Sequence, residues 1–208
     1  MTKIKIAFLA IALLLTTAAS AQFSFGIQGG GNLSTFTSNE DGLSTHLKPG
    51  FSAGVSTEFS FARTTGLRSG LFFTTKGART SVPAIDDFNT TANLMYLQVP
   101  VHLAQRINIR GQRFVLHGGP YVAYGIAGGS NRSVDGANVP SWRSFGSGDD
   151  RYKRWDFGVG IGFALEQNRI LTGIGWDMGL LDISNFSHAR RNERVRTQNF
   201  FLTVEYRL

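Results

Sequence analysis

The feature that most constrains the fold is a stretch of strict alternation between residues 155 and 166. Its odd positions are all large and apolar, whereas its even positions are small or charged, in the order WDFGVGIGFALE. A period of two residues places alternate side chains on opposite faces of a β-strand. A core-facing strand of a soluble protein buries its bulk, but here the bulk forms one long stripe that starts with an aromatic residue. We therefore predict a strand whose apolar face contacts lipid.

The first 21 residues have the features of an export signal. Two lysines precede an apolar run from Ile6 to Leu15, and the small residues Ala19 to Ala21 follow. This order is typical of a secretory signal peptide, so we expect cleavage before Gln22 and a single outer-membrane barrel domain over residues 22–208. The apolar run is shorter than the roughly 20 residues that a membrane-spanning helix needs. Any insertion into a membrane therefore has to use strands.

Charge and cysteine content exclude several classes of function. The formal net charge of +7 is compatible with nucleic acid binding, but an exported chain is not expected to meet nucleic acid, and basic loops equally suit anionic lipid head groups. The sequence has no cysteine, which excludes disulfides and thiolate metal sites. The four histidines share no metal-ligand spacing. We expect neither a metal nor a cofactor.

Eight alternating segments follow the signal, and no useful length of helical periodicity accompanies them. They lie at residues 23–31, 50–61, 66–77, 94–105, 113–126, 155–166, 170–181 and 197–208. The connections after the second, fourth and sixth segments are short, whereas those after the odd-numbered segments are long. This pattern is typical of an outer-membrane barrel with tight periplasmic turns and long outer loops. The sequence predicts an all-β fold, an eight-stranded antiparallel up-and-down transmembrane β-barrel, and we expect a monomer in the bacterial outer membrane.

Two local features accompany this prediction. Pro100 stands in the middle of the fourth segment, where its missing N–H predicts a bulge or a bend. Aromatic residues gather toward both ends of the strands, as in interfacial girdles. The expected girdles are Phe23, Phe59, Phe61 and Tyr206 on the periplasmic side, and Tyr124, Trp155 and Trp176 on the outer side. A soluble β-sandwich or lipocalin-like barrel, with the stripes facing inward, stays open as an alternative.

The inward positions carry a group of ionisable residues. An eight-stranded barrel has an interior just wide enough for its own side chains, and inward glycines should make room for large ones such as Tyr121. Opposite charges there should pair, because an unpaired buried charge is costly. The expected charge cluster in the periplasmic half comprises Glu58, Arg68, His102, Glu166, Glu205 and Arg207. We interpret it as a structural plug and keep a narrow gated channel as the alternative.

Aromatic and basic residues gather in the last two outer loops. The expected interaction surface comprises Trp142, Arg143, Phe145, Arg151, Lys153, Arg154, Arg190, Arg191, Arg194 and Arg196. Such a group suits anionic lipopolysaccharide or a protein partner of the cell envelope. Solvated loops are also often charged without binding anything, so both interpretations stay open.

One loop carries residue types that catalysis uses. Asp182, Ser187 and His188 are the kinds of residue that a nucleophile and its base require. Their order and spacing match no known catalytic motif, and the glycine runs lack the following helix that a phosphate site needs. We therefore expect no enzyme, and a lipid-active barrel enzyme stays only as an alternative.

Four short motifs lie in order along the chain. They are Tyr96-Leu97-Gln98-Val99-Pro100, Gly118-Gly119-Pro120-Tyr121-Val122, Asp156-Phe157-Gly158 and Gly179-Leu180-Leu181-Asp182-Ile183. With these motifs the chain resembles the PorT-like outer-membrane β-barrel family of Gram-negative bacteria. The resemblance implies an eight-stranded barrel, and some members of that family take part in a protein secretion and gliding apparatus. The final residue, Leu208, departs from the aromatic ending that is common in outer-membrane strands.

Overall fold

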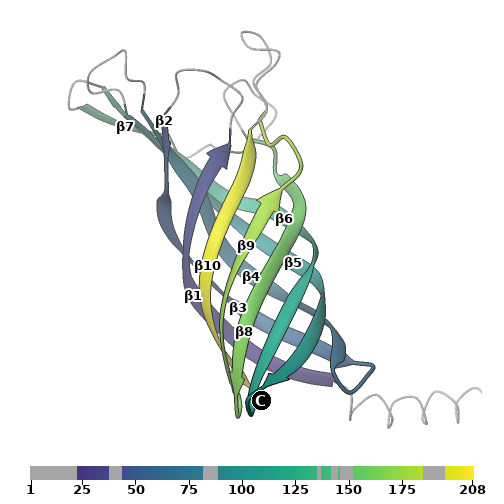
Figure 1. Cartoon of the computed structure of the whole chain (residues 1–208). Coiled ribbons are helices and arrows are strands. Elements are labelled where there is room, and N and C mark those ends of the chain that lie inside the picture. Colours follow the sequence, from purple (N-terminus) through teal and green to yellow (C-terminus); the bar gives the residue numbers. More distant parts are fainter. Residues whose placement is uncertain are drawn as a thin grey trace, which may run out of the picture.

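The computed structural model describes residues 23–37, 44–81, 89–134, 137–141, 145, 152–184 and 195–208. Eight long strands in this part of the chain form a barrel (Figure 1). They are β1 (Phe23–Thr37), β3 (Lys48–Ser60), β4 (Thr65–Ser81), β5 (Asn89–Ile109), β6 (Gln112–Val134), β8 (Trp155–Gln167), β9 (Ile170–Gly179) and β10 (Arg196–Arg207). Two short strands, β2 (Ser44–His46) and β7 (Ala137–Ser141), lie at one end. The predicted signal peptide lies outside the described residues, and its cleavage stays a prediction.

The barrel closes because every long strand pairs with two neighbours. Each pairs antiparallel with the long strand next to it along the chain, and β10 pairs with β1, for example at Thr203 opposite Gly30. The predicted eight-stranded antiparallel barrel is confirmed. Within the described part of the chain, no helix has the length and apolarity that crossing a bilayer requires.

The faces of β8 show which side of the barrel is apolar. Trp155 is 59% exposed, whereas the next residue, Asp156, is fully buried in the lumen, and this alternation continues to the end of the strand. The same outward belt includes Ile27 on β1, Leu71 on β4 and Val204 on β10. The apolar stripes therefore face outward, and the soluble alternative with inward stripes is wrong.

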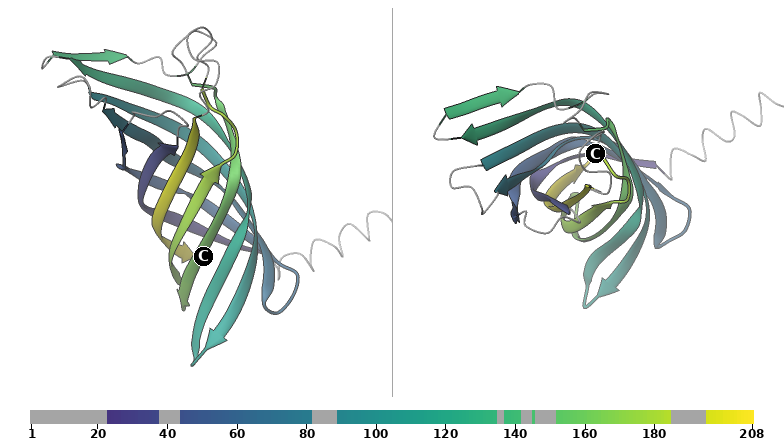
Figure 2. Two further views of the ribbon diagram at one scale, coloured as in Figure 1. Left: turned by 45° about the horizontal axis from the view of Figure 1, so that its top comes forward. Right: turned by 90° about the horizontal axis from the view of Figure 1, so that it is seen from above.

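The strands extend further at the outer end than the sequence predicts. Parts of residues 78–93 and 127–152, predicted as loops, continue the ladders of β4, β5 and β6 and add β7. These polar segments are rich in threonine and asparagine and carry no apolar alternation, so their strand state comes from pairing that starts in the barrel. Figures 1 and 2 show them leaning away from the barrel at the end opposite the short turns. We call residues 78–81, 89–93, 127–134 and 137–141 the outer extension.

Pro100 disturbs the ladders without forming the predicted bulge. The β4–β5 pairing is interrupted between Ser69 opposite Val101 and Phe72 opposite Gln98, and its register is unchanged. The carbonyl of Pro100 instead accepts a 2.7 Å hydrogen bond from the Ser69 hydroxyl. The register shift lies between Met95 and the next residue of β5, so the predicted position of the bulge is wrong. The missing N–H of proline accounts for the interruption.

Aromatic pairs mark both ends of the lipid-facing belt. The rings of Phe23 and Phe59 lie 4.9 Å apart at the end with the short turns. Tyr124 and Trp155 lie 5.0 Å apart at the outer end. Trp176 does not join them, because it pairs with the middle of β8.

Candidate functional site

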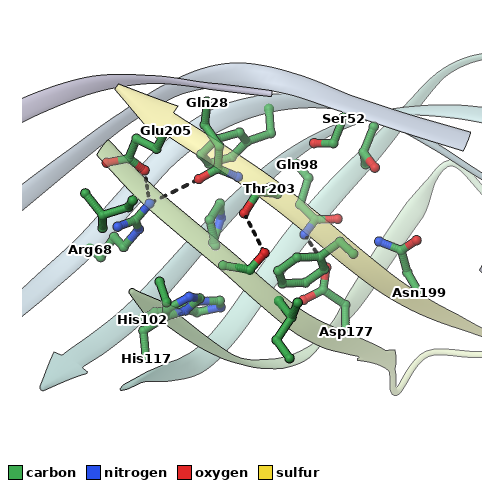
Figure 3. A pocket seen from close by; sticks show the side chains of 18 of the residues that line it. Gln28, Ser52, Arg68, Gln98, His102, His117, Asp177, Asn199, Thr203 and Glu205 are labelled. Atoms are coloured by element: carbon green, nitrogen blue, oxygen red, sulfur yellow. Dashed lines mark hydrogen bonds and ion pairs between the residues drawn. The ribbon is translucent and has the colours of Figure 1, made fainter. Parts of the chain in front are cut away.

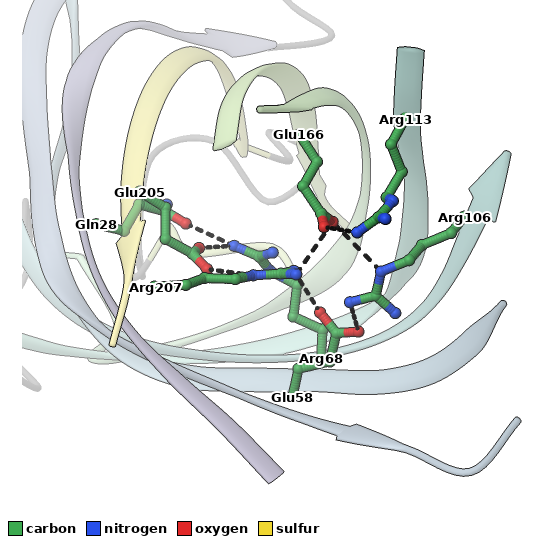
Figure 4. Close-up of polar contacts among 8 residues, drawn as sticks. All are labelled: Gln28, Glu58, Arg68, Arg106, Arg113, Glu166, Glu205 and Arg207. Atoms are coloured by element: carbon green, nitrogen blue, oxygen red, sulfur yellow. Dashed lines mark hydrogen bonds and ion pairs between the residues drawn. The ribbon is translucent and has the colours of Figure 1, made fainter. Parts of the chain in front are cut away.

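The periplasmic half of the lumen is filled by an ion-pair network (Figure 4). We define it by its members Glu58, Arg68, Arg106, Arg113, Glu166, Glu205 and Arg207. Arg207 lies 2.9 Å from Glu58 and 3.0 Å from Glu166, and Arg106 contacts the same two carboxylates at 2.5 and 3.3 Å. Each carboxylate is therefore held by arginines from different strands.

The network differs from the cluster expected from the sequence. Arg106 and Arg113 were not among the expected members, although Arg113 lies 2.7 Å from Glu166. Arg106 stands one residue beyond the predicted end of its strand, so its inward position was missed. Arg68 is paired in the ladder with Glu58 but forms its ion pair with Glu205 instead. The alternation along a strand predicts the face on which each residue lies, but it does not predict which residue across the lumen becomes its ion-pair partner.

His102 was expected in the charge cluster but lies outside the network. It stacks on His117, with ring centroids 5.3 Å apart and an interplanar angle of 20°. The two Nδ1 atoms are 3.1 Å apart. A carbon added at Gly162 would lie 2.5 Å from the His117 ring, so this inward glycine makes room for the pair.

A second charged layer lies nearer the outer end and was missed among the candidate sites. Lys76 Nζ lies 3.1 Å from Asp156 Oδ2. The same carboxylate oxygen accepts hydrogen bonds from Thr197 at 2.9 Å and from Tyr121 at 3.3 Å. A carbon added at Gly158 would lie 2.6 Å from the Tyr121 ring, as expected for a large side chain that crosses toward an inward glycine. The period-two pattern indicates the face on which each of these residues lies, but it does not indicate that they lie at the same height in the lumen.

An apolar cap closes the lumen above this layer. Its members include Phe36, Leu94, Tyr96, Phe145, Ile183 and Val195, all buried. Phe145 is 7% exposed and packs edge-on against Tyr96, with centroids 5.5 Å apart. The assignment of Phe145 to the exposed interaction surface is therefore wrong, because the ring fills the space above Gly125.

Three expected members of the interaction surface are exposed at the outer rim. Lys153 donates to the carbonyl of Asp182 at 3.2 Å, and Arg154 donates to the carbonyl of Gly125 at 3.0 Å. Arg196 begins β10 with an exposed side chain. The remaining members lie outside the described residues and stay predictions: Trp142, Arg143, Arg151, Arg190, Arg191 and Arg194.

Asp182 joins the ends of β9 and β10 at this rim. Its Oδ1 accepts hydrogen bonds from the Ser184 hydroxyl at 2.7 Å and from the amides of Ser184 and Val195, both at 3.0 Å. Burial acts to raise the pKa of Asp182, but these hydrogen bonds and nearby Lys153 outweigh it and lower the pKa below its usual 3.8. Asp182 therefore acts as a clasp between strand ends. Ser187 and His188 lie outside the described residues.

The described residues contain no group of three or more His, Cys, Asp or Glu side chains placed to hold a metal ion. What the geometry offers instead is a lumen filled in layers and an outer end that extends beyond the barrel.

One family model matches most of this chain, and several solved outer-membrane proteins are similar to it. The family model for an outer membrane protein beta-barrel domain matches residues 2–185. Neisserial surface protein A is 12% identical, with a TM-score of 0.46, covering 88% of this chain and 96% of its own. Ail of Yersinia pestis is 14% identical, with a TM-score of 0.48 and coverages of 90% and 99%. OprG of Pseudomonas aeruginosa is 13% identical, with a TM-score of 0.42 and coverages of 90% and 96%. No curated protein sequence matches the chain.

Proposed function

Because the chain belongs to the outer membrane protein β-barrel domain family, we propose that it is a structural and interaction protein of the bacterial outer membrane. The observation that carries this proposal is the contrast between its inside and its outer end. The apolar cap, the Lys76 layer and the periplasmic network cross the lumen at successive heights. The outer extension, in contrast, projects beyond the barrel (Figure 2).

The outer extension and the neighbouring rim are the proposed binding surface. The last strand of the extension, β7, pairs with β6 alone in the described part of the chain, so its other edge offers backbone hydrogen-bonding groups. Lys153, Arg154 and Arg196 add positive charge at the rim. Together with the predicted basic loops, this surface suits an anionic partner such as lipopolysaccharide or an acidic face of an envelope protein.

Two narrower proposals rest on less. Membership of the PorT-like group, and with it a role in a secretion and gliding apparatus, rests on the four short motifs in the sequence. Action as a monomer is the default for a closed barrel, because closure leaves no unpaired edge in the lipid.

The alternatives lack a supporting observation. A channel needs a continuous path, and the lumen is crossed by ion pairs and an apolar cap. A lipid-active enzyme at the rim would need the carboxylate of Asp182, which is engaged as a strand clasp. Neither alternative uses the outer extension.

Charge reversal at the outer end tests the proposal. Changing Arg190, Arg191, Arg194 and Arg196 to glutamate should weaken lipopolysaccharide binding by the reconstituted barrel or reduce the recovery of partners crosslinked to the outer loops in intact cells. A control variant changes Arg63, Arg110 and Arg169 to glutamate in the same way. These three arginines are exposed at the turns of the opposite end. Binding and crosslinking that are unchanged in the first variant, or equally reduced in both variants, would contradict the proposal.

A further inference from the structure

A chamber of about 70 Å³, lined by both polar and apolar side chains, lies in the lumen between the Lys76 layer and the periplasmic network (Figure 3). It is large enough for about five water molecules. Its polar lining includes Ser52, Arg68, Gln98, His102, Asp177 and Asn199. Figure 3 shows Gln98, Asn199 and Asp177 on one side of the chamber and the two stacked histidines on the other.

Asp177 is a buried carboxylate without an ion pair. It is 4% exposed, and in the described part of the chain no lysine or arginine forms an ion pair with it. Lys76 acts on it electrostatically but is already paired with Asp156. Arg68, across the chamber, is held by Glu205 and Gln28. A buried charge left in this way is costly unless another cation compensates it.

Two amide oxygens beside Asp177 also lack partners. Gln98 donates its Nε2 to Asp177 Oδ2 at 2.9 Å, which leaves its Oε1 without a hydrogen bond. Asn199 lies directly opposite Asp177 in the β9–β10 ladder and also hydrogen-bonds to the Asp177 carboxylate, and its Oδ1 is likewise unpartnered. Gln98 is 8% exposed and Asn199 is 3% exposed. Buried oxygens are normally satisfied, so the two atoms indicate a ligand that interacts with acceptors.

We propose that this chamber binds one small monovalent cation, with the carboxylate of Asp177 as its charged ligand and the amide oxygens of Gln98 and Asn199 as neutral ligands. Carboxylate and carbonyl oxygens are the ligands that hard cations prefer. One uncompensated carboxylate matches one positive charge, and the chamber has room for water to complete the coordination. The site is separate from the outer surface, so its test does not depend on the proposed interaction function.

The competing arrangement is a proton on Asp177. A neutral carboxyl group would remove the charge and could donate to one of the two amide oxygens, leaving the other unpartnered. The two arrangements differ in their response to sodium, since only the cation site couples folding to the sodium concentration.

Urea unfolding of the full mature barrel in micelles distinguishes the cation site from the protonated carboxyl group. Sodium chloride is exchanged for choline chloride at constant total salt, because choline is too bulky for the chamber to hold together with its ligands. At sodium concentrations above the dissociation constant of the proposed site, each tenfold rise in the sodium concentration should raise the folding equilibrium constant about tenfold. Equal unfolding midpoints in sodium and choline would overturn the proposal and favour the protonated carboxyl group.

Two variants make the test specific. Asp177→Asn keeps the shape and loses the charge, so the sodium dependence should disappear. Ser52→Ala changes the chamber wall away from the proposed ligands and should keep that dependence. A sodium response that persists in Asp177→Asn would overturn the proposal. If that variant does not fold, the sodium-23 NMR signal can be measured with the wild-type barrel. The proposal predicts that the barrel broadens this signal and that added potassium reverses the broadening. A signal that is not broadened would refute the site.

Discussion

Lys76 Nζ lies 3.1 Å from Asp156 Oδ2 inside the barrel, and both side chains are fully buried. The ammonium group also lies 4.4 Å from the centre of the Tyr121 ring. Removing either partner of such a buried pair is costly, because the charge of the remaining partner is then left uncompensated inside the barrel. The pair therefore holds β4 and β8 together across the lumen while it blocks the path through the barrel.

Replacing Lys76 with methionine tests this layer. We expect a loss of about 3–5 kcal/mol in the free energy of unfolding, because Asp156 stays buried without its cation. The double variant Lys76→Met with Asp156→Asn should recover much of that loss, since no charge is then left unpaired. Urea unfolding in micelles measures both. A single variant as stable as the wild type would contradict the interpretation of the pair.

Gly162 should tolerate no side chain while His117 is present. A Cβ at this position would lie 2.5 Å from the His117 ring, so Gly162→Ala should destabilise the barrel by about 1–3 kcal/mol through overpacking. The loss should shrink in a His117→Ala background, and a double-mutant cycle measures the coupling. Gly29→Ala is the matched control, because the nearest atom would be 3.9 Å away. Equal costs at Gly162 and Gly29 would refute the packing argument.

The clasp at Asp182 should respond to pH. Its pKa in the folded chain lies below the usual 3.8, so its contribution to stability is present above that value and is lost as the pH falls through the lower folded value. The amide proton resonances of Ser184 and Val195 should therefore shift together in acid, below about pH 4. In Asp182→Asn this shared transition should be missing. A transition that is unchanged in the variant would assign it to another group.

The lipid-facing stripe predicts a cost that depends on depth. Ile161 is 53% exposed and lies in the middle of β8, so Ile161→Arg should cost about 2–4 kcal/mol in a lipid bilayer. Ile109→Arg, at the periplasmic end of β5, makes the same chemical change and should cost about 0–1 kcal/mol. The free energy of folding into lipid vesicles measures both. Equal costs at the two sites would argue against a bilayer centred on Ile161.

The barrel could be predicted from the alternation, because the sequence of each strand shows which of its residues lie on the apolar face and which on the other face. Trp155 and Asp156 point to opposite sides as their pattern indicates. The height of a residue in the lumen cannot be predicted from this pattern, because it depends on the stagger between strands. For this reason the sequence does not predict that Lys76 and Asp156 are partners. Arg106 was missed because it stands one residue beyond the predicted end of its strand.

The outer end could be predicted least. Phe145 follows no periodic pattern, and only the space above Gly125 explains why its ring is buried in the cap. The sequence of the outer extension is mostly polar, so no apolar alternation marks it. Its strands exist because β5 and β6 continue a ladder that begins in the barrel.

A barrel filled in this way should carry no steady ionic current, and planar-bilayer recording of the mature wild-type chain tests this most directly. We predict a current equal to that of the protein-free bilayer. The variant Glu58→Ala with Arg68→Ala should behave in the same way, because the Lys76 layer and the apolar cap remain in place. Reproducible conductance steps in the wild type that change in size in this variant would contradict a closed lumen and establish the channel.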